Sequence, residues 1–120
     1  MEDHVTLHST TINNKHYLEF DFPKHLTAQM AEETIPLWKE MYNKIKQGEK
    51  ADLIFNCELM SGFDTEARRK WQAALGELKS QTGEIWIVSD NIFILGAAKT
   101  MGLLTGFSIK VTRSLAEVGK

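Results

Sequence analysis

The chain has 120 residues, of which 42% are hydrophobic and 25% are charged, and its formal net charge is -2. This length suits one domain that buries its own core and is too short for two substantial domains. Charges of both signs are interspersed without a basic block, which argues against nucleic-acid binding. The single cysteine, Cys57, cannot form an internal disulfide and lies in an apolar run, as is typical of a reduced compartment.

Two features of the sequence bear on targeting and membrane insertion: the N-terminal segment and the longest apolar stretch. The first ten residues, MEDHVTLHST, lack a basic segment followed by an apolar one, so no signal peptide is predicted. The longest apolar stretch, from Ile92 to Leu104, is interrupted by glycine and lysine and is shorter than the ~20 residues that span a bilayer. We therefore expect a cytoplasmic protein without a membrane span, in which residues 1–120 form a single domain.

The N-terminal part predicts a β-hairpin. Apolar residues alternate with polar ones on both sides of the Asn13-Asn14 pair, and asparagine tolerates positive φ angles in tight turns. A two-residue turn there would place His16 opposite Thr11 and Glu19 opposite His8.

The segment after Thr27 predicts a helix that ends near Gly48. Apolar residues recur there every three or four positions, with acidic residues early and lysines late, as the helix dipole favours. Pro36 has no N–H to donate, so the helix should kink at this residue or restart with Thr34 near its cap.

Two continuous apolar runs, at residues 52–57 and 85–88, predict strands buried on both faces of a sheet. Residues 67–78 between them have the spacing of an amphipathic helix that packs one face on the sheet. A helix from Ile92, a strand at 107–111 and a short terminal helix complete the order β-β-α-β-α-β-α-β-α. Strand-helix-strand units imply parallel neighbours, so we predict an α/β fold with one mixed, mostly parallel sheet and an antiparallel N-terminal hairpin.

The helix from Ile92 to Leu104 carries apolar residues on more than one face, and this pattern has two interpretations. The helix could be buried on several sides as part of the core. Alternatively, Phe93, Ala97 and Met101 could dock a protein partner or a second copy, or line a pocket for an apolar ligand.

Four stretches in this order and spacing resemble the STAS superfamily, and more closely its SpoIIAA-like members, the anti-sigma factor antagonists. The resemblance runs from about Leu26 to Val118. The stretches are HLTAQMAEE, ADLIFNC, GFDTEA and GEIWIVSDNIFILGAAKTMGLLTGFSIKVTRSLAEV. The resemblance implies a compact sheet with helices mainly on one face, no cofactor, and function through protein contact.

In regulatory members of this family, a kinase phosphorylates a serine in an Asp-Ser-Ser-Gly segment at the start of the second main helix. Here Asp64 matches, Thr65 replaces the first serine, Glu66 replaces the phosphorylated serine, and Ala67 replaces the glycine. We therefore expect a module that works without the serine phosphorylation switch.

The physical chemistry of the Asp64–Glu66 segment supports a structural role. A helix N-terminus favours negative charge, and Asp64 could accept backbone N–H bonds as the cap while Glu66 adds charge in the first turn. Thr65 remains the hydroxyl that a kinase could modify, but a phosphate there would be repelled by the two carboxylates.

The candidate chemical sites in the sequence are a metal site and an enzyme active site. His4, His8, His16 and His25 fall on different segments without the close spacing or the Cys and Asp partners of zinc sites, so we predict no metal. An enzyme would need a base beside Ser61 or Cys57, and the sequence places no histidine next to either residue.

The leading hypothesis is therefore a non-catalytic protein-interaction module in signalling that uses segments 58–68 and 89–101 as its contact surface. Its alternative is a carrier of a small apolar or lipid-like ligand, and a small enzyme is the third possibility. The predicted contact residues are Phe63, Asp64, Thr65, Glu66, Arg68, Asn91, Phe93, Ala97 and Met101.

Overall fold

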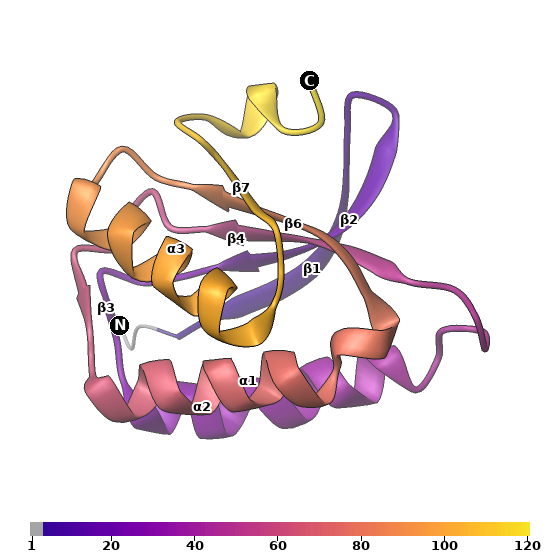
Figure 1. Ribbon diagram of the computed structural model, residues 1–120, viewed down its shortest axis with the longest axis horizontal. Helices are drawn as coiled ribbons and strands as arrows, with labels where there is room; N and C mark the ends of the chain where they lie inside the picture. The colour runs from indigo at the N-terminus through magenta and orange to yellow at the C-terminus, as the bar shows by residue number, and fades with distance from the viewer. Residues whose placement is uncertain (1–3) are drawn as a thin grey trace.

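A computed structural model describes residues 4–120 and contains a five-stranded sheet with the order β1-β2-β4-β6-β7 (Figure 1). Strand β1 is antiparallel to β2, and all other neighbours in this sheet are parallel. The predicted α/β fold with a mixed, mostly parallel sheet is therefore confirmed. The strands are β1 (Thr6–Ile12), β2 (Lys15–Asp21), β4 (Ala51–Asn56), β6 (Thr82–Val88) and β7 (Ile109–Thr112).

The predicted hairpin register is also confirmed. Asn13 and Asn14 adopt φ angles of 51° and 65°, and the pairing sets His16 opposite Thr11 and Glu19 opposite His8. The hairpin tip also holds the C-terminal segment, because the Asn13 side-chain amide donates to the carbonyls of Ala116 and Val118 at 3.1 and 2.8 Å.

The helices α1 (Ala28–Tyr42), α2 (Thr65–Glu77) and α3 (Ile92–Thr105) cover one face of the sheet (Figure 1). Two short parallel strands that the sequence analysis did not predict, β3 (His25–Leu26) and β5 (Gly62–Phe63), pair just before α1 and α2. The remaining elements are single 3-10 turns, η1 (Lys79–Gln81) and η2 (Leu115–Glu117). The last of these stands where a short terminal α-helix was expected.

Helix α1 ends earlier than predicted, and its continuity excludes the restart that was one of the two alternatives at Pro36. It runs without a restart through Pro36 and ends at Tyr42, well before Gly48. The buried face of α1 includes Thr34 before the proline and Trp38 after it, so packing on the sheet holds both halves of the helix in place despite the lost backbone bond. The chain then makes turns up to Gly48, whose φ is +87°.

An aromatic cluster joins the sheet to α1 and α2. The ring of Phe20 on β2 lies 5.1 Å from Trp38 of α1, 5.0 Å from Phe55 of β4 and 5.5 Å from Trp71 of α2, each in an edge-to-face geometry. All four side chains are buried. Such pairs add favourable quadrupole contacts to the large apolar area that the rings remove from water.

The opposite face of the sheet has a smaller apolar cluster, which includes Ile54, Trp86 and Val88. Val118 from the C-terminal segment is fully buried against it. The four predicted apolar positions of β6, residues 85–88, are thus buried on alternate faces, as expected for an interior strand.

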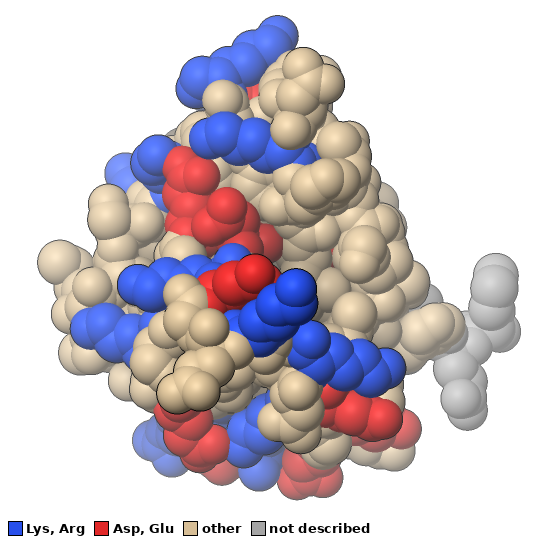
Figure 2. Space-filling model, turned by 90° about the vertical axis from the view of Figure 1, so that its right-hand side faces the viewer, with Lys and Arg blue, Asp and Glu red and all other residues tan. Residues whose placement is uncertain are grey.

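One face of the molecule carries charges of both signs. Figure 2 shows acidic and basic residues interspersed there. This mixture is consistent with the net charge of -2 and leaves no extended basic area on that face for a nucleic-acid backbone.

Helix α3 approaches β7 most closely at Gly102, which is buried. A Cβ atom at Gly102 would lie 3.0 Å from the Phe107 carbonyl oxygen and 3.1 Å from Ile109 Cδ1, whereas one at Gly96 would meet no atom within 4 Å. The position where α3 needs a glycine is therefore 102.

These two glycines form a matched pair for a stability test. We expect Gly96→Ala to stabilise the protein by about 1 kcal/mol, because alanine has the better helix propensity. Gly102→Ala should lower stability despite the same gain in propensity, since its methyl group forces α3 away from β7. Urea unfolding of both variants measures the difference, and equal stabilisation by both would contradict the close contact at Gly102.

Candidate functional site

A small apolar cavity lies between α3, the sheet and the segment that joins β4 to α2. Its volume is about 70 Å³, and Arg68 is the single charged residue among those that line it in the described chain. The other lining residues are Phe22, Leu26, Phe55, Cys57, Met60, Phe63, Trp71, Ile87, Ile94, Ala97, Ala98, Met101 and Ile109.

Two phenylalanines pack together beside this cavity. Phe63, which lines the cavity, stacks on Phe93 of α3 with ring centroids 5.6 Å apart and ring planes 17° apart. Phe93 is nevertheless 63% exposed, and its neighbour Ile92 is 86% exposed. We call Phe63, Ile92 and Phe93, together with the cavity, the Phe63–Phe93 surface.

The exposure of α3 decides between its two interpretations. Only Ile94 and Gly102 are buried within its 14 residues, while Leu103 and Leu104 near its end are 86% and 60% exposed. The helix therefore packs on the sheet with one side and leaves large apolar side chains open on the other. It is not a core helix covered on several sides.

The structure brings together the apolar members of the predicted contact surface. Phe63, Ala97 and Met101 line the cavity together with the charged Arg68, and Phe93 stacks on Phe63. Residues that the prediction missed are Met60 and Cys57, which also line the cavity, and the exposed Ile92. The apolar run before Cys57 and the continuous apolar stretch from Ile92 were the available signals.

The polar members of the predicted surface have mainly structural contacts. Asn91 is the N-cap of α3, and its side-chain oxygen accepts hydrogen bonds from the N–H groups of Phe93 and Ile94 at 2.9 and 3.3 Å. Thr65 and Glu66 are exposed in the first turn of α2, where Glu66 lies 3.7 Å from Arg69.

Asp64 occupies the N-cap position of α2, but its side chain makes no capping bond to that helix. One carboxylate oxygen contacts His25 Nε2 at 2.8 Å, and the other accepts the N–H of Ala28 in α1 at 3.2 Å. The expected cap is thus corrected to a bridge between the starts of two helices. The cause is the β3–β5 pairing, which sets His25 beside Gly62.

No nucleophile and base are assembled at Ser61 or Cys57. The Ser61 hydroxyl donates to the Lys24 carbonyl at 3.4 Å, while His25 contacts Asp64. Burial raises the pKa of the Cys57 thiol to about 12. The thiol is therefore protonated at neutral pH and is a poor nucleophile.

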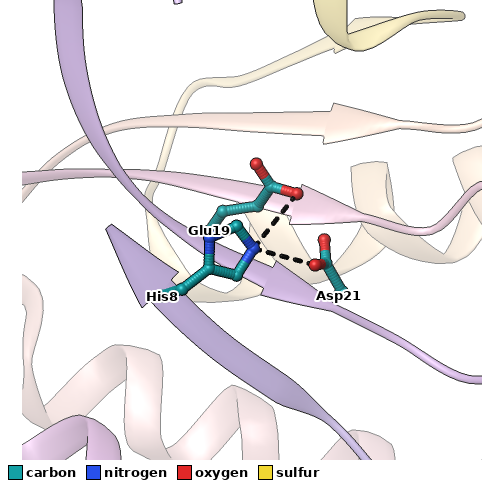
Figure 3. A group of neighbouring side chains, drawn as sticks. All are labelled: His8, Glu19 and Asp21. Atoms are coloured by element: carbon teal, nitrogen blue, oxygen red, sulfur yellow. Dashed lines mark hydrogen bonds and ion pairs between the residues drawn. The ribbon is translucent and has the colours of Figure 1, made fainter. Parts of the chain in front are cut away.

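A polar cluster lies on the sheet face opposite the helices. It consists of His8 on β1 with Glu19 and Asp21 on β2 (Figure 3). Burial and the neighbouring Asp21 carboxyl raise the pKa of Glu19 to about 7, and a hydrogen bond with Asp21 raises the pKa of His8. The predicted hairpin register already paired His8 with Glu19, but the contribution of Asp21 was missed.

The fold of the chain is similar to that of a solved structure. Neither any protein-family model nor any curated protein matches the chain. An uncharacterized protein of the DUF3478 family from Shewanella loihica PV-4, described as having a SpoIIAA-like fold, superposes with a TM-score of 0.78. The match covers 96% of this chain and 90% of that one, at 14% sequence identity.

The chain has a SpoIIAA-like fold. This confirms the fold that the four sequence stretches predicted, and at 14% identity the likeness extends to the fold alone. Within the described residues of this SpoIIAA-like chain, no helix combines the length and the apolar character needed to cross a bilayer.

The bridge made by Asp64 predicts a specific pH dependence. The hydrogen bond with His25, together with the Ala28 N–H, holds the pKa of Asp64 below its ordinary value. The ionised carboxylate therefore stabilises the fold above its unfolded-state pKa, and this stability is lost as the pH falls through the lowered folded-state pKa. Wild type should melt above Asp64→Asn at neutral pH, and the gap should close in acid.

Thermal unfolding followed by circular dichroism from neutral to acid pH measures this gap. Asp90→Asn, at an exposed aspartate before α3, is the matched control and should show no such gap. A difference between wild type and Asp64→Asn that stays constant over the whole pH range would contradict the role of the ionised carboxylate.

Proposed function

We propose that the chain is a non-catalytic interaction module that binds a protein partner on the Phe63–Phe93 surface. The observation that carries the proposal is the exposure of Ile92 and Phe93, at 86% and 63%, beside an apolar cavity. Contiguous exposed apolar side chains around a pocket are typical of binding sites, because a partner removes them from water.

The size of the cavity favours a protein partner. A volume of about 70 Å³ holds roughly two water-sized groups, given about 30 Å³ for each. It therefore suits the end of one apolar side chain from a partner better than an entire ligand. Interfaces often draw much of their affinity from one such anchor in a pocket surrounded by contacts that exclude water.

The position of the surface within the fold agrees with this proposal. Segments 58–68 and 89–101 follow β4 and β6 at the carboxyl ends of two adjacent parallel strands, where open α/β sheets usually bind ligands and partners. The SpoIIAA-like fold adds an analogy with anti-sigma factor antagonists, which act through protein contact. We infer a regulatory role in cytoplasmic signalling without the serine switch.

Site-specific photo-crosslinking in the cells that produce the protein tests this proposal. A photoreactive phenylalanine analogue at position 93 should capture a partner, and the same analogue at Leu37, which is 55% exposed on α1, should not. Ile92→Asp should abolish the crosslink at 93, because a carboxylate cannot be buried unpaired at an apolar contact. Chains crosslinked to each other would identify a second copy as the partner.

Two outcomes would contradict the proposal. Equal crosslinking from positions 93 and 37, or crosslinking at 93 that survives Ile92→Asp, would remove the Phe63–Phe93 surface as the binding site. Circular dichroism of Ile92→Asp is the control for folding, and no loss of structure is expected because this side chain is solvent-exposed.

A carrier of a small amphiphilic ligand is the second candidate. The observation in its favour is Arg68, the one charged residue among those that line the cavity in the described chain. An apolar chain could fill the cavity while an anionic head group contacts Arg68, since guanidinium pairs well with carboxylate or phosphate.

Native mass spectrometry of freshly purified protein separates the carrier from the interaction module. A carrier should show an added ligand mass that disappears in Ala97→Phe, which fills the cavity, and persists in Ala116→Phe at an exposed position. Unliganded protein throughout, together with a crosslinked partner at position 93, would exclude the carrier.

A further inference from the structure

The cluster on the sheet face opposite the helices contains three side chains that commonly bind metals. Residues of a strand alternate between faces, so Phe20 enters the core while Glu19 and Asp21 share the other face. His8 lies directly opposite Glu19 in the antiparallel register and reaches diagonally to Asp21. Figure 3 shows the imidazole pointing toward both carboxylates.

The distances in this cluster are those of a coordination site. His8 Nε2 lies 2.8 Å from Asp21 Oδ2 and 3.6 Å from Glu19 Oε2, and one donor atom from each of the three side chains lies within 4.8 Å of the others. Four ligands about 2.1 Å from a tetrahedral Zn²⁺ are roughly 3.4 Å apart. The two measured distances fall on either side of this value, so small side-chain rotations would suffice.

The charge of the cluster is not balanced by lysine or arginine. Among the ion pairs of residues 4–120, both carboxylates pair with His8 alone. The Glu19 side chain is only 5% exposed, and it also contacts the Asn56 amide at 3.5 Å and the neighbouring Asp21 carboxyl. A buried carboxylate beside a second, half-exposed one is stabilised by a proton or a cation between them.

One oxygen in the cluster is buried without a protein donor. Oδ1 of Asp21 has no hydrogen-bond partner among the described residues and is shielded from solvent. Buried oxygens of this kind are uncommon, because each loses its bonds to water. A proton carried by Glu19 or a bound cation would each satisfy it.

We propose that His8, Glu19 and Asp21 bind a divalent transition-metal ion such as Zn²⁺, with solvent completing the coordination. The side chains of His8 and Asp21 are 41% and 38% exposed, so an ion can reach the site and keep a water ligand. An imidazole with two carboxylates suits zinc and its neighbours, whereas calcium and magnesium prefer oxygen ligands alone. This proposal departs from the expectation of no metal drawn from sequence spacing.

The metal would have a structural consequence for the hairpin. Strand β1 is at the edge of the sheet, and its one partner is β2. An ion shared by His8 of β1 and two residues of β2 would fasten this edge strand. Binding to the folded state alone also raises the unfolding temperature in proportion to the logarithm of the free metal concentration.

Isothermal titration of Zn²⁺ into untagged, chelator-treated protein tests the site. We expect a single saturable ion per chain with a dissociation constant at or below about 10 μM. Each of His8→Ala, Glu19→Gln and Asp21→Asn should weaken Zn²⁺ binding by more than about tenfold. Loss of a residue that only supports a metal ligand already lowers the affinity by about tenfold or more, and loss of the ligand itself should lower it at least as much. Cobalt absorption in the visible range should report tetrahedral coordination in wild type and be lost in the variants.

Two control variants distinguish this site from other surface groups. His16→Ala removes a histidine of the same hairpin, whose ring contacts Thr11 instead, and Glu84→Gln removes a carboxylate that pairs with Lys110. Both should bind Zn²⁺ as wild type does. No saturable binding, or binding that survives all three ligand variants, would overturn the proposal and leave the cluster as a carboxyl pair that shares a proton.

Discussion

The packing of Phe20 against Trp38, Phe55 and Trp71 is the contact on which the rest of the fold depends. These rings fill the space between the sheet and the pair α1 and α2, and they fix both helices at a set height above it. The sheet area under α3 instead receives small residues such as Ala97 and Ala98. The apolar cavity lies where these short side chains leave the space beside Phe55 and Trp71 incompletely filled.

Strand alternation links the core to the polar cluster on the opposite face. Since Phe20 must point toward the helices, Glu19 and Asp21 must point away from them, whatever their own preferences. The hairpin register then places His8 on the same face of the sheet, opposite Glu19. A single residue of register shift would bury the carboxylates among the rings, so the aromatic contact and the composition of the polar cluster are determined together.

The sequence predicted local and periodic features well. The hairpin register followed from the Asn13-Asn14 turn, and the buried strands followed from continuous apolar runs. The features that sequence reasoning missed depend on contacts between distant segments. Asp64 has the right local position for a cap, but the β3–β5 pairing draws its carboxylate to His25 and Ala28. The cavity was also unpredictable, because it depends on how the volumes of side chains from seven helices and strands add up.

The segment between β4 and α2 differs from the phosphorylated Asp-Ser-Ser-Gly segment of the family that the sequence resembles, and this difference bears on how it could contact a partner. A phosphorylated serine would alter binding by adding charge at the start of α2, but Glu66 stands at that position and lies 3.7 Å from Arg69. A glutamate is part of the chain and is not added or removed by a kinase and a phosphatase, so it cannot act as a reversible signal. In the proposed interaction module, recognition would rest on what the segment and α3 present at all times, which is the apolar area of Phe63, Ile92 and Phe93. Binding through that area would depend on the abundance of the partner and on shape complementarity, since burial of apolar surface needs no change of charge.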